Sequence, residues 1–129
     1  MGWSLSAWWR ADRLYAQGTR LMRAGRPAEA ARAYGEVAAL LPWHYRALIQ
    51  QARALSAAGR AGEAVKAAKR AAELAPKSHA PMLVLGQIQY DSGHYEEARK
   101  GFAAAARLDP ENRMAQAYLG LSLLALGRI

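Results

Sequence analysis

The stretch that decides the fold runs from residue 79 to residue 112 and reads HAPMLVLGQIQYDSGHYEEARKGFAAAARLDPEN. Gly93 separates two apolar-rich runs in it, and Pro110 closes the second run. Glycine tolerates the positive φ that ends many helices, and a proline pushes the residue before it out of the α region. The stretch therefore predicts two helices joined by a tight turn.

Glycine, proline and alanine recur at equivalent positions every 34 residues along the chain. The recurring residues are Pro42, Pro76 and Pro110, then Gly25, Gly59, Gly93 and Gly127, then Ala30, Ala64 and Ala98. Three residue series at one spacing indicate a repeat protein. We expect helices at about residues 7–24, 27–40, 44–58, 61–74, 79–92, 95–108 and 113–126, antiparallel to their neighbours because the turns are short.

The pattern resembles the tetratricopeptide repeat family. The third repeat carries it best, at Leu85, Gly86, Gly93, Tyr95, Ala98, Phe102, Ala105 and Pro110, whereas in the second repeat Ala52, Ala61 and Ala68 replace a glycine and two aromatics. The resemblance implies an all-α fold, a right-handed α-solenoid of antiparallel helix pairs. It divides the chain into a Trp-rich extension (1–10), three repeats (11–44, 45–78 and 79–112) and the first helix of an incomplete fourth repeat (113–129).

Composition limits the cellular context and the chemistry. The 129 residues include no cysteine, which excludes disulfides and thiolate metal sites, and no apolar run approaches the ~20 residues that span a bilayer. The start has no basic segment of the kind that opens a secretory signal. We therefore expect a cytoplasmic protein, with a peripheral place on a membrane complex left open by the N-terminal tryptophans.

The net charge of +8 is concentrated in the first half of the chain. Residues 1–60 carry nine Lys and Arg against three Asp and Glu, a formal charge of +6, and residues 61–129 carry nine against seven, or +2. A basic half attracts acidic proteins, anionic lipid or nucleic acid. The alternative is that the arginines only lie on ordinary solvated helix faces and bind no partner.

No pattern in the sequence indicates catalysis. His44, His79 and His94 fall at turns and helix starts, with no i, i+4 pair and no acidic ligand cluster. We expect no enzyme activity, cofactor, metal or small-molecule substrate. Helical repeats that read RNA need matched side chains in every repeat, and corresponding positions here do not match, which disfavours nucleic acid.

The family resemblance implies a concave groove lined by one stripe of each first helix. These positions hold Tyr15, Thr19, Met22, Arg46, Ile49, Arg53, Leu83, Gln87, Tyr90, Met114 and Leu121, with Arg23 beside them. Inward packing does not require apolar residues there, and aromatics, methionine and arginine are enriched in protein interfaces. We expect the groove to bind a partner segment that has apolar anchors and acidic residues; an incidental surface is the alternative.

One subfamily is disfavoured. Tetratricopeptide domains that clamp the acidic tails of heat-shock chaperones use lysines, asparagines and an arginine, and the matching positions here hold Tyr15, Thr19, Gln50, Ala80 and Val84.

Both ends of the chain carry apolar side chains with no obvious partner. Trp3, Trp8 and Trp9 either fold back over the first hairpin, insert into a partner or lie at a membrane interface. Leu119, Leu123 and Leu126 form a stripe that predicts a docking edge for another protein or a second copy, unless the chain is a fragment of a longer repeat protein. Two functions thus remain: an adaptor that binds a segment in its groove, and an assembly subunit docked through these ends.

Overall fold

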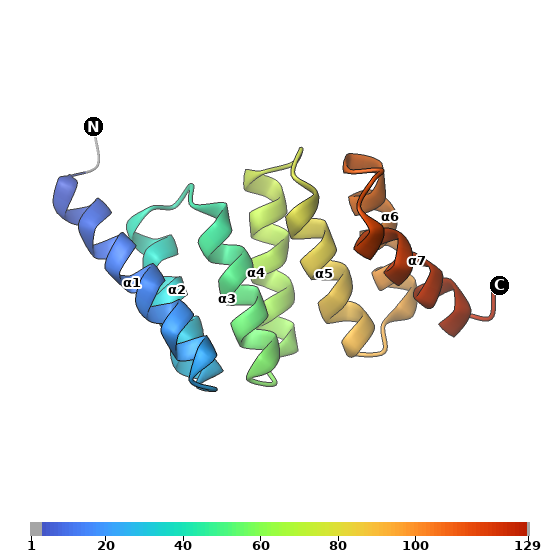
Figure 1. The fold of residues 1–129 in the computed structure, drawn as a ribbon, viewed down its shortest axis with the longest axis horizontal. Coiled ribbons are helices and arrows are strands. Elements are labelled where there is room, and N and C mark those ends of the chain that lie inside the picture. The colour runs from blue at the N-terminus through green and yellow to red at the C-terminus, as the bar shows by residue number, and fades with distance from the viewer. Residues whose placement is uncertain (1–3, 129) are drawn as a thin grey trace.

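The computed structural model describes residues 4–128, and these form seven helices (Figure 1). The helices are α1 (Leu5–Arg23), α2 (Pro27–Leu40), α3 (Tyr45–Ala57), α4 (Ala61–Leu74), α5 (His79–Asp91), α6 (Tyr95–Leu108) and α7 (Arg113–Ala125). Each observed end lies within two residues of the expected one. The helix boundaries were therefore readable from the glycine and proline positions.

The helices stack as a row of antiparallel pairs from one end of the molecule to the other (Figure 1). The helices pack within the pairs α1–α2, α3–α4 and α5–α6, and each even helix also packs on the odd helix that follows it. The odd helices touch one another as well, α3 against α5 and α5 against α7. We call the surface formed by α1, α3, α5 and α7 the odd-helix face.

The turns that end the odd helices share one hydrogen-bond pattern. The glycines at their ends, Gly25, Gly59, Gly93 and Gly127, have φ of 75°, 80°, 80° and 70°. The amide after each glycine donates to a carbonyl in the last helical turn, as in Arg60 N to Leu55 O at 2.8 Å. An added Cβ would meet nothing within 4 Å, so the positive φ, not space, requires glycine here.

Side-chain caps set where the odd helices begin. His44, Ser78 and Asn112, spaced by the repeat, accept hydrogen bonds from amides in the first turns of α3, α5 and α7. The corresponding residue of the first repeat is Arg10, which cannot accept such a bond. The helix instead starts earlier and is capped by Ser4, whose Oγ accepts from Ala7 N at 3.2 Å. Residues 5–10 are thus the first turns of α1, which begins two residues before the expected start.

Candidate partner-binding surface

Two arginines stand on the odd-helix face without acidic partners. Arg46 and Arg53 are seven residues apart, two turns along α3, and both side chains are exposed. Among residues 4–128, no carboxylate lies within 4.0 Å of either guanidinium. The Arg46 guanidinium lies 5.8 Å from the centre of the Tyr45 ring. The pair therefore offers positive charge that no described carboxylate neutralises.

Two neighbouring hollows flank this pair. The first, of about 330 Å³, is lined by Trp8, Ala11, Asp12, Tyr15, Leu41, His44 and Arg46. The second, of about 320 Å³, is lined by Tyr15, Tyr45, Arg46, Ile49, Gln50, Arg53, Ser78, His79 and Ala80. They share Tyr15 and Arg46 and so adjoin each other. Their volumes are at the low end for ligand pockets, which suits one or two side chains of a peptide better than a cofactor.

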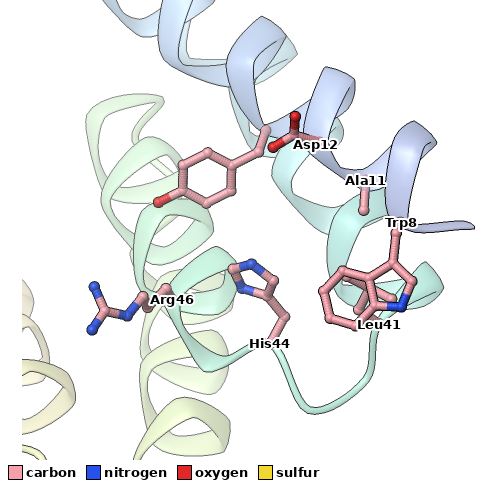
Figure 2. Close-up of a pocket in the computed structure, with 7 residues that line it drawn as sticks. Trp8, Ala11, Asp12, Leu41, His44 and Arg46 are labelled. Carbon is pink, nitrogen blue, oxygen red and sulfur yellow. The ribbon is translucent and has the colours of Figure 1, made fainter. Parts of the chain in front are cut away.

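Three segments build the first hollow (Figure 2). Trp8 comes from the start of α1, Leu41 from the turn after α2, and His44 from the cap of α3. Figure 2 shows Trp8 and Leu41 at one end of the hollow and Arg46 at the other, with His44 between them. The His44 ring is held in place because Nδ1 accepts from Ala47 N at 3.1 Å. The hollow thus has an apolar end and a positively charged end.

Tyr15 forms the wall between the two hollows. Its ring packs edge-on against Tyr34, with centroids 5.3 Å apart, and its centroid lies 5.7 Å from that of His44. Burial raises the pKa of the Tyr15 phenol and Tyr34 raises it further, whereas Gln50 and the charges of Arg46 and Arg53 lower it. The balance is a raised pKa, so the Tyr15 phenol is neutral at physiological pH.

Some of the predicted groove residues contact other residues of the chain. Thr19 Oγ1 donates to the Tyr15 carbonyl at 3.2 Å and lies 3.0 Å from the Tyr34 hydroxyl. Met22 is partly buried against the core, whereas Arg23 is exposed near the end of α1. Thr19 therefore links α1 to α2, and Met22 packs on the core, so both contribute little free surface.

Ile49 and Leu83, predicted to line the groove at positions that inward packing does not require, are buried. Ile49 is 5% and Leu83 7% exposed, and both belong to hydrophobic core clusters. The physical reason is that each of these helices touches the next odd helix across the odd-helix face. Ile49 belongs to the cluster that includes Ile88 of α5, and Leu83 to the cluster that includes Ala115 of α7. Ile49 contributes only to the lining of the second hollow.

The remaining predicted residues lie farther along the odd-helix face. Gln87 Nε2 donates to Met114 Sδ at 3.4 Å, which links α5 to α7. Tyr90 is half-buried, with ring centroids 5.2 Å from Tyr95 and 5.9 Å from Tyr118. Met114 and Leu121 are 52% and 44% exposed. The face thus continues onto α7, but its arginines and the two hollows gather at α1 and α3.

The tryptophans at the start of α1 divide between two roles. Trp8 is 48% exposed and packs against Trp43, with ring centroids 5.9 Å apart, so it does lie over the first hairpin. Trp9 is 70% exposed and points away from the core. Trp3 lies outside the described residues.

The predicted stripe on α7 is partly wrong. Leu119, Leu123 and Leu126 are half-buried, and Leu119 packs against the cluster around Phe102. The more exposed side chains are Leu121, at 44%, and Leu124, at 60%. The helix turns its Leu119 side toward α6, because Ala115 and Ser122, which share that side, are buried at the contact.

Sequence reasoning missed Leu41, Trp43 and His44 as contributors to the surface. All three belong to the turn around Pro42, and the repeat pattern marks this turn only as a helix end. The hollow forms because the extended α1 reaches this turn, and no spacing within one helix encodes that meeting. The capping role of Ser4 was the available signal, since a Ser before an apolar run favours a helix start.

Neither a metal site nor a spanning helix occurs in residues 4–128. Their His, Asp and Glu residues form no group of three that could hold a metal ion. No described helix has the length and apolar character needed to cross a membrane.

Two family models match the sequence, both described as tetratricopeptide repeat, over residues 15–79 and 55–121. The chain belongs to the tetratricopeptide repeat family. Domains of this family are typically non-catalytic interaction modules. No curated protein sequence matches the chain closely.

Solved tetratricopeptide domains share the fold. The first such domain of human RPAP3 superposes with a TM-score of 0.86 at 21% identity, covering 92% of this chain and 93% of that one. The second domain of human RPAP3, solved with the HSP70 peptide SGPTIEEVD, gives 0.83 at 20% identity, covering 90% and 97%. The Yersinia enterocolitica type III secretion chaperone SycD, solved with a peptide of the translocator YopD, gives 0.79 at 16% identity, covering 88% and 92%. These likenesses show the fold and leave the ligand of this chain to be inferred from its own residues.

Proposed function

We propose that this tetratricopeptide protein is an adaptor that binds an extended or helical segment of another protein along α1 and α3. An apolar side chain of that segment occupies the first hollow, and acidic residues beside it pair with Arg46 and Arg53. The observation that carries the proposal is the placement of two adjoining hollows beside two arginines that no described carboxylate neutralises. Domains of the same fold that were solved with bound peptides support a peptide as the ligand.

The charge pattern of the surface favours an acidic segment. Arg46 and Arg53 both lower the pKa of Tyr15, which indicates that their positive field reaches the wall between the hollows. Asp12 is the opposing charge, and it lines the first hollow. We therefore place the apolar anchor near Trp8 and Leu41, and the acidic residues toward α3.

Selection from a random peptide display library tests the proposal. We expect the selected peptides to combine an aromatic or aliphatic residue with nearby acids. Calorimetric titration with one such peptide should show that Arg46→Glu with Arg53→Glu weakens binding at least about tenfold, which is about 1.4 kcal/mol. Asp12→Asn should tighten binding slightly, since it removes the opposing charge.

Lys66→Glu with Lys69→Glu is the matched control. These lysines are exposed on the even helix α4, and their substitution changes the net charge equally. The control should bind the peptide like the wild type, and both double variants should keep their stability within about 0.5 kcal/mol in thermal melts. Equal losses in the two variants, or peptides selected without acids, would contradict the assignment of the surface.

Exposed apolar side chains on α7 favour a second candidate, a subunit that assembles through this helix. Met114, Leu121 and Leu124 are exposed and lie along one side of this helix, at the spacing i, i+7, i+10. Light scattering should then show a dimer or a larger complex that Leu121→Glu with Leu124→Glu dissociates, while circular dichroism stays helical. A wild type that remains monomeric at high concentration would exclude self-assembly through α7.

A further inference from the structure

A second surface, apart from the arginine pair and α7, lies where α1 begins. Leu5, Trp8, Trp9 and Trp43 are 79%, 48%, 70% and 41% exposed, and we call these four residues the aromatic corner. They come from the first turns of α1 and from the turn between α2 and α3. Both segments lie at the same edge of the molecule in Figure 1, and the Trp8 and Trp43 rings are 5.9 Å apart. Leu5, Trp8 and Trp9 also line one hollow together with Asp12. The corner is thus a continuous surface that is apolar apart from the Asp12 carboxylate.

Trp9 and Leu5 contribute little to the fold as it stands. Both side chains point away from the buried side of α1, which is marked by Ala7, Ala11 and Gly18. Large apolar side chains gathered in water mark a contact surface. Tryptophan is enriched where water meets lipid, because its ring is apolar while its indole N–H stays hydrated.

Positive charge adjoins the corner. Along α1, the four guanidiniums of Arg10, Arg13, Arg20 and Arg23 stand against the single carboxylate of Asp12. Arg10 and Arg13 follow the tryptophans directly and are exposed. Glu36 lines a hollow with them, yet within the described chain no carboxylate approaches either one to 4.0 Å. Guanidinium groups in this position can form bidentate hydrogen bonds with phosphate groups.

The size of the corner favours a lipid surface over a protein. At about 250 Å² or less for each aromatic side chain, the exposed parts of these residues fall short of the ~800 Å² that a stable protein interface takes from each partner. Binding to a membrane surface has no such minimum, because each inserted side chain and each nearby cation adds to it.

We propose that the aromatic corner docks this protein on an anionic membrane surface, with Trp9 and Leu5 inserted at the interface and Arg10 and Arg13 bound to lipid phosphates. The contact is peripheral, since the side chains that insert come from the first turns of α1. The inserted residues Leu5 and Trp9 line neither of the two hollows, but the corner shares Trp8 with the first hollow, so a docked corner and an occupied first hollow compete for that side chain. Arg53 and the second hollow stay free for a protein segment.

Vesicle sedimentation with the full chain tests this proposal. The wild type should bind phosphatidylcholine vesicles that contain phosphatidylserine and should bind pure phosphatidylcholine weakly. Leu5→Ser with Trp9→Ser should weaken binding to the anionic vesicles at least about tenfold. Arg10→Glu with Arg13→Glu should weaken it at least about thirtyfold, since each basic residue near the surface contributes severalfold.

Two matched controls separate the corner from general properties of the protein. Lys66→Glu with Lys69→Glu makes the same charge change at the same spacing on α4, and Leu121→Ser with Leu124→Ser removes exposed apolar side chains from α7. Both should bind anionic vesicles within about threefold of the wild type. Circular dichroism of every variant shows whether the helices remain.

Four outcomes would overturn the proposal. The first is a wild type that does not bind anionic vesicles, and the second is an unchanged affinity for Leu5→Ser with Trp9→Ser. The third is an equal loss in the two charge-reversal variants, which would mean that the net charge alone attracts the protein. The fourth is self-association of the wild type that Leu5→Ser with Trp9→Ser abolishes without any vesicle binding, which would make the corner an interface between copies.

Discussion

The second and third helix pairs fill the space between their two helices with different side chains. In α5–α6, the Phe102 ring fills the space over Gly86, whereas in α3–α4 the corresponding residues are Ala68 and Ala52. All four are buried. A Cβ on Gly86 would stand 2.7 Å from Phe102 Cε1, while the Ala52 methyl has room because Ala68 has no ring. The second pair, which departs from the family pattern, is therefore a compensated exchange of volume between two helices.

The first helix pair has the same arrangement as the third, a glycine on one helix facing an aromatic ring on the other. Tyr34 lies over Gly18, where an added Cβ would be 2.8 Å from the ring, and the Tyr34 hydroxyl lies 3.0 Å from Thr19 Oγ1. Phe102 instead stacks on Tyr118 of α7, with centroids 4.9 Å apart. The comparison teaches that the glycine and the ring of a pair must change together, and the following predictions test that rule.

The largest effect should come from Phe102→Ala. The ring is fully buried and stacked on Tyr118, so its removal leaves a cavity and loosens α7. We expect a loss of about 3–5 kcal/mol in the free energy of unfolding, measured by urea denaturation. Phe102→Leu keeps most of the volume and serves as the control, with a smaller loss. A cost below about 1 kcal/mol would show that the surrounding helices collapse into the space.

Gly86→Ala should be destabilising in the wild type and stabilising once the ring is gone. The new methyl group meets Phe102, which is fully buried and stacked on Tyr118, so we expect a cost of about 1–3 kcal/mol. In Phe102→Ala, the methyl enters the vacated space and the helix gains up to about 1 kcal/mol from the better propensity of alanine. A double-mutant cycle by urea denaturation measures this change of sign. Additive effects of the two substitutions would refute the rule.

Ala52→Gly should destabilise the second pair, although it restores the residue of the family pattern. The substitution lowers helix propensity by about 1 kcal/mol and leaves a small gap against Ala68. Thermal melts check the expected loss, with Ala16→Gly, at an exposed position in the interior of α1, as the control for propensity alone. A gain in stability would mean that the pattern, and not the partner side chain, decides the residue at this position.

The smallest effect concerns the turns between the helices of each pair. Arg26 pairs with Glu29 at 2.8 Å and Arg60 with Glu63 at 2.6 Å, but the third repeat has His94 at that position. There Glu96 pairs with Arg99 at 2.8 Å and with Arg128 at 3.0 Å. The hydrogen bond from Arg99 lowers the pKa of Glu96, with a further contribution from the charge of Arg128.

We expect the Glu96 carboxyl group to titrate below the usual glutamate range in a carboxyl-carbon NMR titration. Because its folded-state pKa is lowered, its small contribution to stability is present above the usual glutamate pKa and is lost as pH falls through the folded-state value. Arg99→Gln should move the midpoint back up, and Arg128→Gln should move it less. If neither substitution changes the titration midpoint of Glu96, neither ion pair persists in solution.

The fold was predictable because its signals are local. Glycines that require positive φ and prolines that end helices recur at one spacing, and each acts on the backbone within its own turn. The arginine pair was predictable for a similar reason, because Arg46 and Arg53 lie two turns apart on the outer side of one helix. These features need no knowledge of which segments meet.

The sequence by itself thus determined the helix boundaries, the pairing order and the exposed charges of α3. Only the tertiary structure decided that Ile49 and Leu83 are buried, because α5 packs beside Ile49 and α6 and α7 pack beside Leu83. Only the tertiary structure joined Trp8, Leu41 and His44 into one hollow, because α1 extends past Arg10 and reaches the turn before α3. The physical reason is that periodicity specifies which side of a helix a residue lies on, whereas exposure depends on what packs against that side.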